Sequence, residues 1–396
     1  MKTNYKSPLT IYVVWHPLFK RGRQVADNIY SNFSRDIEDP LSRGIGIPVY
    51  YRSAVQKAGK TPIDIPLGQA DYNAVVVLVD DYLFNDDKWN LFVKDLIKRR
   101  TPQNRIFPIA FSKNAHYFEE SSLGRDQFLN AKPIGKDYEE KEFENVLKTI
   151  CSRLLHGFCR LLLNKKQIHE ANKEINVPQP IKLFISHAKK DNEKEAEDFR
   201  DYIQSTTKLN TFFDANDIAD GYHFDTQIIR AIEDGQAALV VFHSDAYATR
   251  EWCQIEILTA KRYKAPIVVV HNIKSGEKRS FPYLGNAPTI KFSNNNFSDI
   301  IDLTLSQVLV NVFNQFNLEK IRKLYISDIF DIMKLSSPPE LFNFPDILKE
   351  KRNSKKDNFF VLYPDPPIGI NELSVLSEMN NQIKFLTPIE LSTLIK

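Results

Sequence analysis

The sequence predicts an α/β protein with parallel sheets, made of a duplicated unit and a small C-terminal βαβ unit. Short β-branched or aromatic runs alternate along the chain with segments of helical spacing, which favours parallel sheets with helices on both faces. Residues 74–79 are almost purely β-branched, as is typical of a central strand covered on both faces. The same order of elements begins again after residue 180, which indicates an internal duplication.

Two units of similar layout, residues 1–170 and 178–325, are expected to occupy most of the chain. In the first unit, the runs with strand-like composition are residues 9–15, 47–51, 74–79 and 105–110. In the second unit, they are residues 181–186, 211–213, 237–242 and 266–271. Helical spacing occurs at residues 22–33, 91–100, 143–163, 193–203, 224–233, 251–263 and 297–313. A charged stretch that ends with Pro178 and Pro180 is typical of a domain boundary between the two units.

The last segment, residues 326–396, is expected to hold a linker and a small α/β appendage. The basic run at residues 349–356 fits a solvated linker better than a binding patch. Residues 359–363, 370–379 and 383–386 follow as strand, helix and strand. A βαβ piece of this size is too short to hold a core alone, so we expect it to dock on the rest of the protein.

Composition excludes several classes of protein. Hydrophobic residues make up 42% of the chain and charged residues 26%, which is typical of a folded soluble protein. The net charge of +3, with acidic and basic residues interspersed, argues against direct nucleic-acid binding. The 3 cysteines and 8 histidines show neither a disulfide framework nor a metal-ligand spacing. No apolar run has the length of a signal-peptide core or a membrane span, so we expect a cytoplasmic protein.

The most informative segment runs from Tyr247 to Glu256, where a loop leads into a helix directly after a buried strand. Trp252 and Glu256 are four residues apart, and on a helix such residues share one face. An indole and a carboxylate would therefore point into the same cleft. The spacing alone also fits a solvated carboxylate on a helix face and a tryptophan in the core.

Motifs in the second unit carry a family resemblance. The run Phe-Ile-Ser-His at residues 184–187 is followed by Asp191, and the run Phe-Phe-Asp at residues 212–214 is followed by turn residues. Further along stand Ser244 and the Trp-Cys-x-x-Glu motif at residues 252–256. In this order the motifs resemble the first box, the BB loop and the helix C region of TIR (Toll/interleukin-1 receptor) domains.

One motif departs from the family pattern. TIR domains often carry a Phe-Trp box, but in this sequence Phe281 is followed by Pro282. The resemblance otherwise extends over residues 181–292 and implies a flavodoxin-like fold with five parallel strands.

The resemblance also implies a catalytic residue. TIR domains divide into adaptors that only assemble and enzymes that cleave NAD+, and the enzymes carry a glutamate on helix C four residues after an aromatic residue. Glu256 after Trp252 matches that position. The residues that the resemblance implies at the substrate are Trp252, Ser186, His187, Asp214, Ser244 and Tyr247. His187 also fits a histidine satisfied within the fold, and Asp214 also fits a turn residue.

One carboxylate is sufficient for the implied chemistry. Ordinary glycosidases need two, one of which protonates an alcohol leaving group. Nicotinamide in NAD+ is a cationic pyridinium and departs neutral, so no general acid is required. A single buried anion can hold the ribose hydroxyls and stabilise an oxocarbenium-like transition state, an effect worth roughly 3–4 kcal/mol. NAD+ would be the substrate, and neither a cofactor nor a metal is expected.

Self-association is a further property that the resemblance implies, with the BB loop of one domain completing the site of the next. The loop residues expected at this interface are Asp217, Gly221, Tyr222 and Phe224. Gly221 allows a sharp turn, and the two aromatic residues are anchors of the kind that interfaces use. Asp217 also fits a turn residue, and Phe224 also fits a contact with the core of its own domain.

The first unit is less similar to the family and differs at its candidate site. When Trp89 is aligned with Trp252, Val93 falls at the position of Glu256. The duplication therefore implies a degenerate TIR-like domain that keeps the fold and lacks the chemistry. Such a domain would serve as a partner, a sensor or a cover for the active one.

These observations predict a TIR-domain NAD+ glycohydrolase, with ADP-ribose or its cyclic form as product, that acts as a bacterial immune (anti-phage) or toxin-like effector. Its expected partners are NAD+, further copies of itself, and an upstream sensor protein or nucleotide signal, but neither a membrane nor a nucleic acid. Two alternatives remain open. One is a non-catalytic TIR scaffold that assembles through its BB loop. The other is a nucleotide or nucleoside transferase on a related fold, which would also use one glutamate.

Overall fold

The computed structural model describes residues 5–39, 44–57, 61–117, 129–131, 139–170, 181–207, 209–212, 237–276, 281–294, 296–326 and 329–394. The chain forms two compact units, Met1–Leu162 and Leu163–Lys396. The first unit contains one sheet and the second contains two. The C-terminal segment therefore belongs to the same compact unit as the second large sheet.

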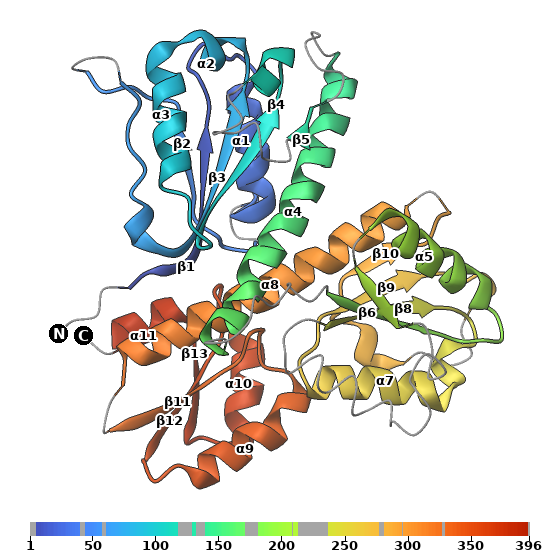
Figure 1. Cartoon of the computed structure of the whole chain (residues 1–396). Coiled ribbons are helices and arrows are strands. Elements are labelled where there is room, and N and C mark those ends of the chain that lie inside the picture. Colours follow the sequence, from blue (N-terminus) through green and yellow to red (C-terminus); the bar gives the residue numbers. More distant parts are fainter. Residues whose placement is uncertain are drawn as a thin grey trace. The chain divides into compact units, whose positions relative to one another are not determined.

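The first unit is built on a five-stranded parallel sheet with the order β2-β1-β3-β4-β5 (Figure 1). Its strands are β1 (Ser7–Val14), β2 (Val49–Arg52), β3 (Ala70–Val79), β4 (Asn104–Ala110) and β5 (Leu129–Asn130). In the centre, Ile11 of β1 aligns with Val49 on one side and with Ala74 on the other. All residues of β1 are buried, which agrees with a strand covered on both faces.

Helices cover both faces of this first sheet. On one face lie α1 (Gly22–Phe33) and α4 (Glu140–Glu170), where the Phe158 ring contacts those of Phe33 and Phe107 at centroid distances of 4.8 and 5.4 Å. On the other face lie α2 (Asp81–Asn85) and α3 (Asp87–Lys98), and Trp89 of α3 packs against the sheet. α3 begins at this point because the Asp86 carboxylate accepts hydrogen bonds from the free N–H groups of its first turn.

The second unit contains a five-stranded parallel sheet with the order β10-β9-β8-β6-β7. Its strands are β6 (Lys182–His187), β7 (Asn210–Phe212), β8 (Ala237–His243), β9 (Ile267–His271) and β10 (Thr289–Lys291). In chain order both five-stranded sheets read 2-1-3-4-5, the flavodoxin-like arrangement. The expected fold class is thus confirmed, and the shared strand order supports a duplication.

Helices also cover both faces of this second sheet. On one face lies α7 (Glu251–Arg262), which buries Cys253 and Ile257 against the strands. On the other face lie α5 (Glu193–Thr206) and the first half of α8 (Phe297–Leu324). The Phe199 ring of α5 contacts the rings of Phe242 and Phe297, at centroid distances of 5.4 and 5.5 Å.

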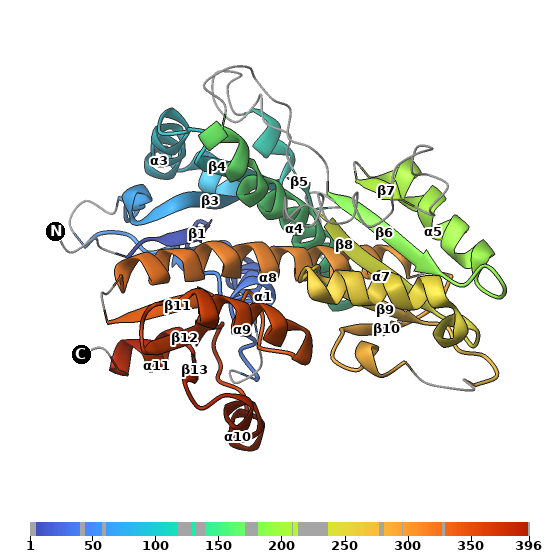
Figure 2. The ribbon, with the colours of Figure 1, turned by 90° about the horizontal axis from the view of Figure 1, so that it is seen from below.

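A three-stranded parallel sheet completes the second unit. Its strands are β11 (Phe330–Lys334), β12 (Asn358–Leu362) and β13 (Ile383–Leu386), in the order β11-β12-β13. One face is covered by α9 (Phe344–Asn353) and α10 (Ile370–Met379), and the other by α11 (Pro388–Leu394) and the end of α8. Figure 2 shows α8 passing from the second sheet to this third one.

The interpretation of residues 349–356 as a linker is wrong. Residues 349–353 form the last part of α9, and β11 precedes that helix. Phe344 and Ile347 of α9 are buried against the third sheet while the basic residues face outward. The basic composition therefore marks the solvent face of an amphipathic helix.

None of the helices in the described ranges combines the length and the apolar character needed to cross a membrane.

Candidate active site

The site is built at the end of β6, where the sheet presents the carboxyl ends of its strands. Ser186 and His187 are the last two residues of β6, and both side chains are buried. The hydroxyl oxygen of Ser186 lies 2.5 Å from that of Tyr247, which is also buried. Tyr247 begins a short 3-10 turn, Tyr247–Thr249, that leads into α7. The end of the first strand is thus bonded to the segment that carries the candidate catalytic helix.

A second contact fixes the loop between β8 and α7. The Asp191 carboxylate accepts a hydrogen bond from the Ser244 hydroxyl at 2.7 Å and another from the backbone N–H of Ala246 at 2.9 Å. Asp191 stands just beyond β6, so the two loops at this edge hold each other. Sequence reasoning noted Asp191 only as part of a motif, because no local pattern pairs it with Ser244.

The loop after β9 is held to the same edge. The Asp245 carboxylate accepts hydrogen bonds from the backbone N–H groups of Lys274, Ser275 and Gly276 at 2.8–3.3 Å. The side-chain amide of Asn272 donates to that of Asn192 at 2.7 Å. The loops that follow the neighbouring strands β6, β8 and β9 are therefore cross-linked, which provides a rigid support for a site at this edge.

α7 places its residues at three different depths. Cys253 is buried, and its thiol donates to the His187 carbonyl at 3.5 Å. Glu256 is half-buried, whereas Trp252 is 68% exposed. The two side chains therefore differ in exposure, although they stand one helical turn apart on the same side of α7.

The charge of Glu256 acts on two buried neighbours. Burial, together with the nearby Cys253 and the Glu256 carboxylate, raises the pKa of Tyr247. Burial and Glu256 raise the pKa of Cys253 to about 12, against a smaller opposing effect of Arg250. Both groups are therefore protonated at neutral pH. Tyr247 remains a hydrogen-bonding phenol, and Cys253 is not available as a thiolate nucleophile.

The structure thus brings together Ser186, His187, Ser244, Tyr247 and Glu256 around the carboxyl ends of β6 and β8. Asp214 and the expected interface residues Asp217, Gly221, Tyr222 and Phe224 lie outside the described residues. Sequence reasoning did not assign a role to Cys253, which lies inside the Trp-Cys-x-x-Glu motif but on the face of α7 that packs against the sheet. In the described ranges, no cluster of three or more His, Cys, Asp or Glu side chains could hold a metal ion.

The corresponding helix of the first unit offers no carboxylate at this position. Val93 is fully buried in the core, and Trp89 is 2% exposed. Trp89 and Trp252, which align in sequence, therefore differ in environment: Trp89 is a core residue and Trp252 is a surface residue. The first unit shares the strand order of the second but uses its aromatic residue for packing.

The model of the TIR domain family matches residues 183–304. Residues 183–304 are a TIR domain. The match begins in β6 and ends within α8, so it includes the whole edge described above. The curated proteins contain no match to the chain.

Proposed function

We propose that the TIR domain is an NAD+ glycohydrolase in which Glu256 stabilises the oxocarbenium-like transition state. The observation that carries the proposal is the position of Glu256 on α7, where its charge acts on the buried Tyr247 hydroxyl and the buried Cys253 thiol. This position lies at the carboxyl edge of a parallel sheet, where open α/β folds bind their ligands. A carboxylate in such a partly desolvated place interacts strongly with developing positive charge.

The surrounding residues suit a mechanism with a single ionised carboxylate. Nicotinamide departs as a neutral molecule, so the site needs no acid to protonate it. The protonated state of Cys253 disfavours a covalent thiolate route. Glu256 would hold the ribose hydroxyls and balance the positive charge on the sugar, and water would then attack the anomeric carbon. Trp252 would form a flat wall for the ring system of the substrate, as exposed aromatic residues do for nucleobases.

Self-association forms part of the proposal. A TIR domain suggests assembly with further copies, and the exposed position of Trp252 agrees with a site that is completed by a neighbouring surface. The first unit would be a TIR-like partner without chemistry, because a buried valine stands where the second unit has its glutamate. Consumption of NAD+, or release of ADP-ribose or its cyclic form, would then be the output of a bacterial immune or toxin-like effector.

The experiment that tests the function is incubation of the purified full-length protein with NAD+, with free nicotinamide measured over time and over a range of protein concentrations. We expect turnover that rises more than proportionally with protein concentration. A complete absence of nicotinamide at high protein concentration would favour the scaffold. Release of nicotinamide only in the presence of a second base or nucleoside would favour the transferase.

A further inference from the structure

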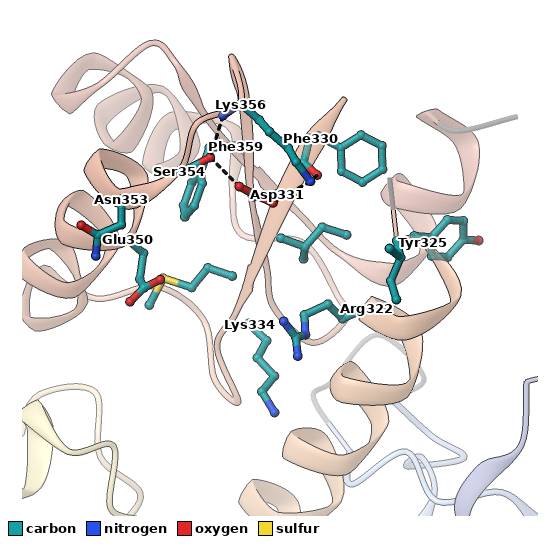
Figure 3. A pocket seen from close by; sticks show the side chains of 13 residues that line it. Arg322, Tyr325, Phe330, Asp331, Lys334, Glu350, Asn353, Ser354, Lys356 and Phe359 are labelled. Atoms are coloured by element: carbon teal, nitrogen blue, oxygen red, sulfur yellow. Dashed lines mark hydrogen bonds and ion pairs between the residues drawn. The ribbon is translucent and has the colours of Figure 1, made fainter. Parts of the chain in front are cut away.

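A hollow of about 570 Å³ lies in the C-terminal part of the second unit, remote in sequence from the candidate active site. Figure 3 shows the side chains that line it. One wall is the end of α8, with Arg322 and Tyr325, and the floor is β11. The opposite wall is formed by the end of α9 and the residues that follow it, including Ser354. The volume falls within the range of about 300–1,000 Å³ that is usual for small-molecule sites.

The hollow follows the free side of an edge strand. Within the described residues, β11 pairs only with β12, so its other side faces the hollow. Phe330 and Ile332 point to the α8 face of the sheet, and Met333 points to the α9 face. Charged residues on an edge strand discourage pairing with another chain, and Lys334 and Asp331 serve that purpose with or without a ligand. Edge protection alone does not require the ion pairs and hydrogen bonds that these charged residues form with other residues around the hollow.

The end of the hollow beside α8 carries excess positive charge. Arg322 and Lys334 both form ion pairs with Glu319, at 2.9 and 2.8 Å, so one carboxylate balances two lining cations. Burial alone would raise the pKa of Glu319, but the hydrogen bonds from Arg322 and Lys334 outweigh it and lower this pKa to about 2. In Figure 3 the side chains of Arg322 and Lys334 lie next to each other. Two adjacent cations that share one carboxylate are a suitable binding site for a phosphate group.

The other end of the hollow carries two carboxylates, Asp331 and Glu350, and one cation, Lys356. Asp331 accepts a hydrogen bond from the Ser354 hydroxyl at 2.6 Å and pairs with Lys356 at 2.9 Å. These contacts, with Ser354 first, lower the pKa of Asp331, so it is ionised at neutral pH. Glu350 adds a second, exposed carboxylate to the lining. Carboxylates in such positions accept hydrogen bonds from ribose hydroxyls.

Apolar and aromatic surface lies between these polar ends and at the rim. The lining includes Tyr325, Ile326, Phe330, Ile332, Met333 and Phe359. Ile326 is 81% exposed, so its apolar side chain is accessible at the rim of the hollow. A flat ring could pack against this surface, because aromatic side chains are the usual platforms for bases.

We propose that this hollow binds a nucleotide, with its phosphate at Arg322 and Lys334 and its ribose hydroxyls at Asp331. The proposal rests on the cavity and its lining, and it does not depend on NAD+ cleavage by the TIR domain. A nucleotide bound here would give the protein a second ligand site, separate from that of Glu256.

The test uses the full-length protein and isothermal titration with AMP and GMP, with inorganic phosphate and adenosine as partial ligands. We expect saturable binding of at least one nucleotide, tighter than that of either partial ligand. The double substitution Arg322→Gln and Lys334→Gln should weaken nucleotide binding by about tenfold or more, because it removes two charge-assisted hydrogen bonds. Asp331→Asn should weaken nucleotide binding and leave phosphate binding unchanged.

Lys323 provides a matched control for these variants. It also approaches Glu319, at 3.6 Å, but it is exposed and does not line the hollow. Lys323→Gln should therefore change nucleotide affinity by less than about threefold. A thermal melt of each variant would confirm that it is folded.

Three results would overturn the proposal. The first is no saturable binding of either nucleotide at millimolar concentration. The second is unchanged nucleotide affinity in a folded Asp331→Asn protein and in the double variant. The third is nucleotide binding that Trp252→Ala abolishes and the hollow variants leave intact, since that pattern would place the nucleotide in the TIR site. Because all readouts are binding constants, a protein that fails to cleave NAD+ would still give a clear answer.

Discussion

The hydroxyl oxygens of Ser186 and Tyr247 lie 2.5 Å apart in the interior of the TIR domain and join the end of β6 to the turn that leads into α7. This contact sets the position of the helix that carries Glu256. We expect Tyr247→Phe to lower the free energy of unfolding by about 1–2 kcal/mol, because it leaves the buried Ser186 hydroxyl without this partner. NAD+ cleavage should fall as well, through a lower kcat. Urea unfolding and nicotinamide release measure the two effects.

The double variant Ser186→Ala with Tyr247→Phe is the control for this contact. Removal of both hydroxyls leaves neither of them without its partner, so the double variant should be more stable than the sum of the two single losses predicts. Losses that simply add would show that the two hydroxyls are not energetically coupled.

A second prediction concerns the ion pair that joins α7 to the 3-10 turn before α9. Lys261, in the last turn of α7, donates to both carboxylate oxygens of Glu340 at 3.0 and 2.9 Å, and its side chain is only 11% exposed. Glu340 also takes part in the capping box at Leu341–Asn343, just before α9. We expect Lys261→Met to lower the free energy of unfolding by about 2 kcal/mol, because it leaves the partly buried Glu340 carboxylate without its ion-pair partner.

The pair between Lys274 and Glu195 serves as the comparison for Lys261. Its N–O distance is also 2.9 Å, but Lys274 is 62% exposed. Lys274→Met should therefore cost less than about 1 kcal/mol in urea unfolding. Equal losses for the two lysines would contradict a special role for the Lys261 contact.

A third prediction follows from the low pKa of Glu319. A carboxyl group whose folded pKa lies below its unfolded value stabilises the fold above the unfolded pKa, and this contribution is lost as the pH falls through the folded one. For Glu319 the stabilisation is lost between its ordinary pKa of 4.5 and its folded pKa of about 2. Glu319→Gln should cost about 1–2 kcal/mol of unfolding free energy at neutral pH, after allowance for solvent screening. The difference from wild type should shrink progressively below about pH 4.5.

Urea unfolding of both proteins at a series of pH values measures this difference. Glu350→Gln is the control, because Glu350 is an exposed carboxylate on α9. Its effect should stay below about 0.5 kcal/mol at neutral pH. A Glu319→Gln difference that is constant down to about pH 3 would contradict the assigned pKa.

The fourth prediction contrasts two tryptophans. Trp252 is 68% exposed, so Trp252→Ala should change the free energy of unfolding by less than about 0.5 kcal/mol. It should raise the KM for NAD+ by about tenfold, because a stacking contact is lost. Trp89 is buried in the first unit, and Trp89→Ala should cost about 3–5 kcal/mol. A folded Trp252→Ala protein with unchanged KM would exclude the indole from the substrate site.

Much of the fold could be predicted from the sequence because long periodic segments carry a strong signal. α1, α10 and β13 occupy the predicted residues, and the buried strands β3 and β8 include the predicted runs. The short edge strands β5 (Leu129–Asn130) and β10 (Thr289–Lys291) were not predicted, since two or three residues show no period. β11 and α9 were missed because the basic run at residues 349–356, which includes the end of α9, suggested a linker.

The candidate site was predictable only where its residues are close in sequence. The spacing of Trp252 and Glu256 could be seen at once, but not that one is exposed and the other half-buried. The contact of Asp191 with Ser244 joins residues 53 positions apart, and that of Lys261 with Glu340 joins residues 79 positions apart. Such contacts depend on how the loops and sheets meet, for which a single sequence has no local pattern.

The most direct test of the proposed function is nicotinamide release by Glu256→Gln beside Glu251→Gln, in the full-length protein. Glu251 is an exposed glutamate in the first turn of the same helix, so it controls for charge on α7. We predict that Glu256→Gln lowers kcat by about two to three orders of magnitude, with an unchanged melting temperature, while Glu251→Gln retains at least half of the wild-type rate. A folded Glu256→Gln protein that releases nicotinamide at the wild-type rate would contradict the assignment of Glu256 as the catalytic residue.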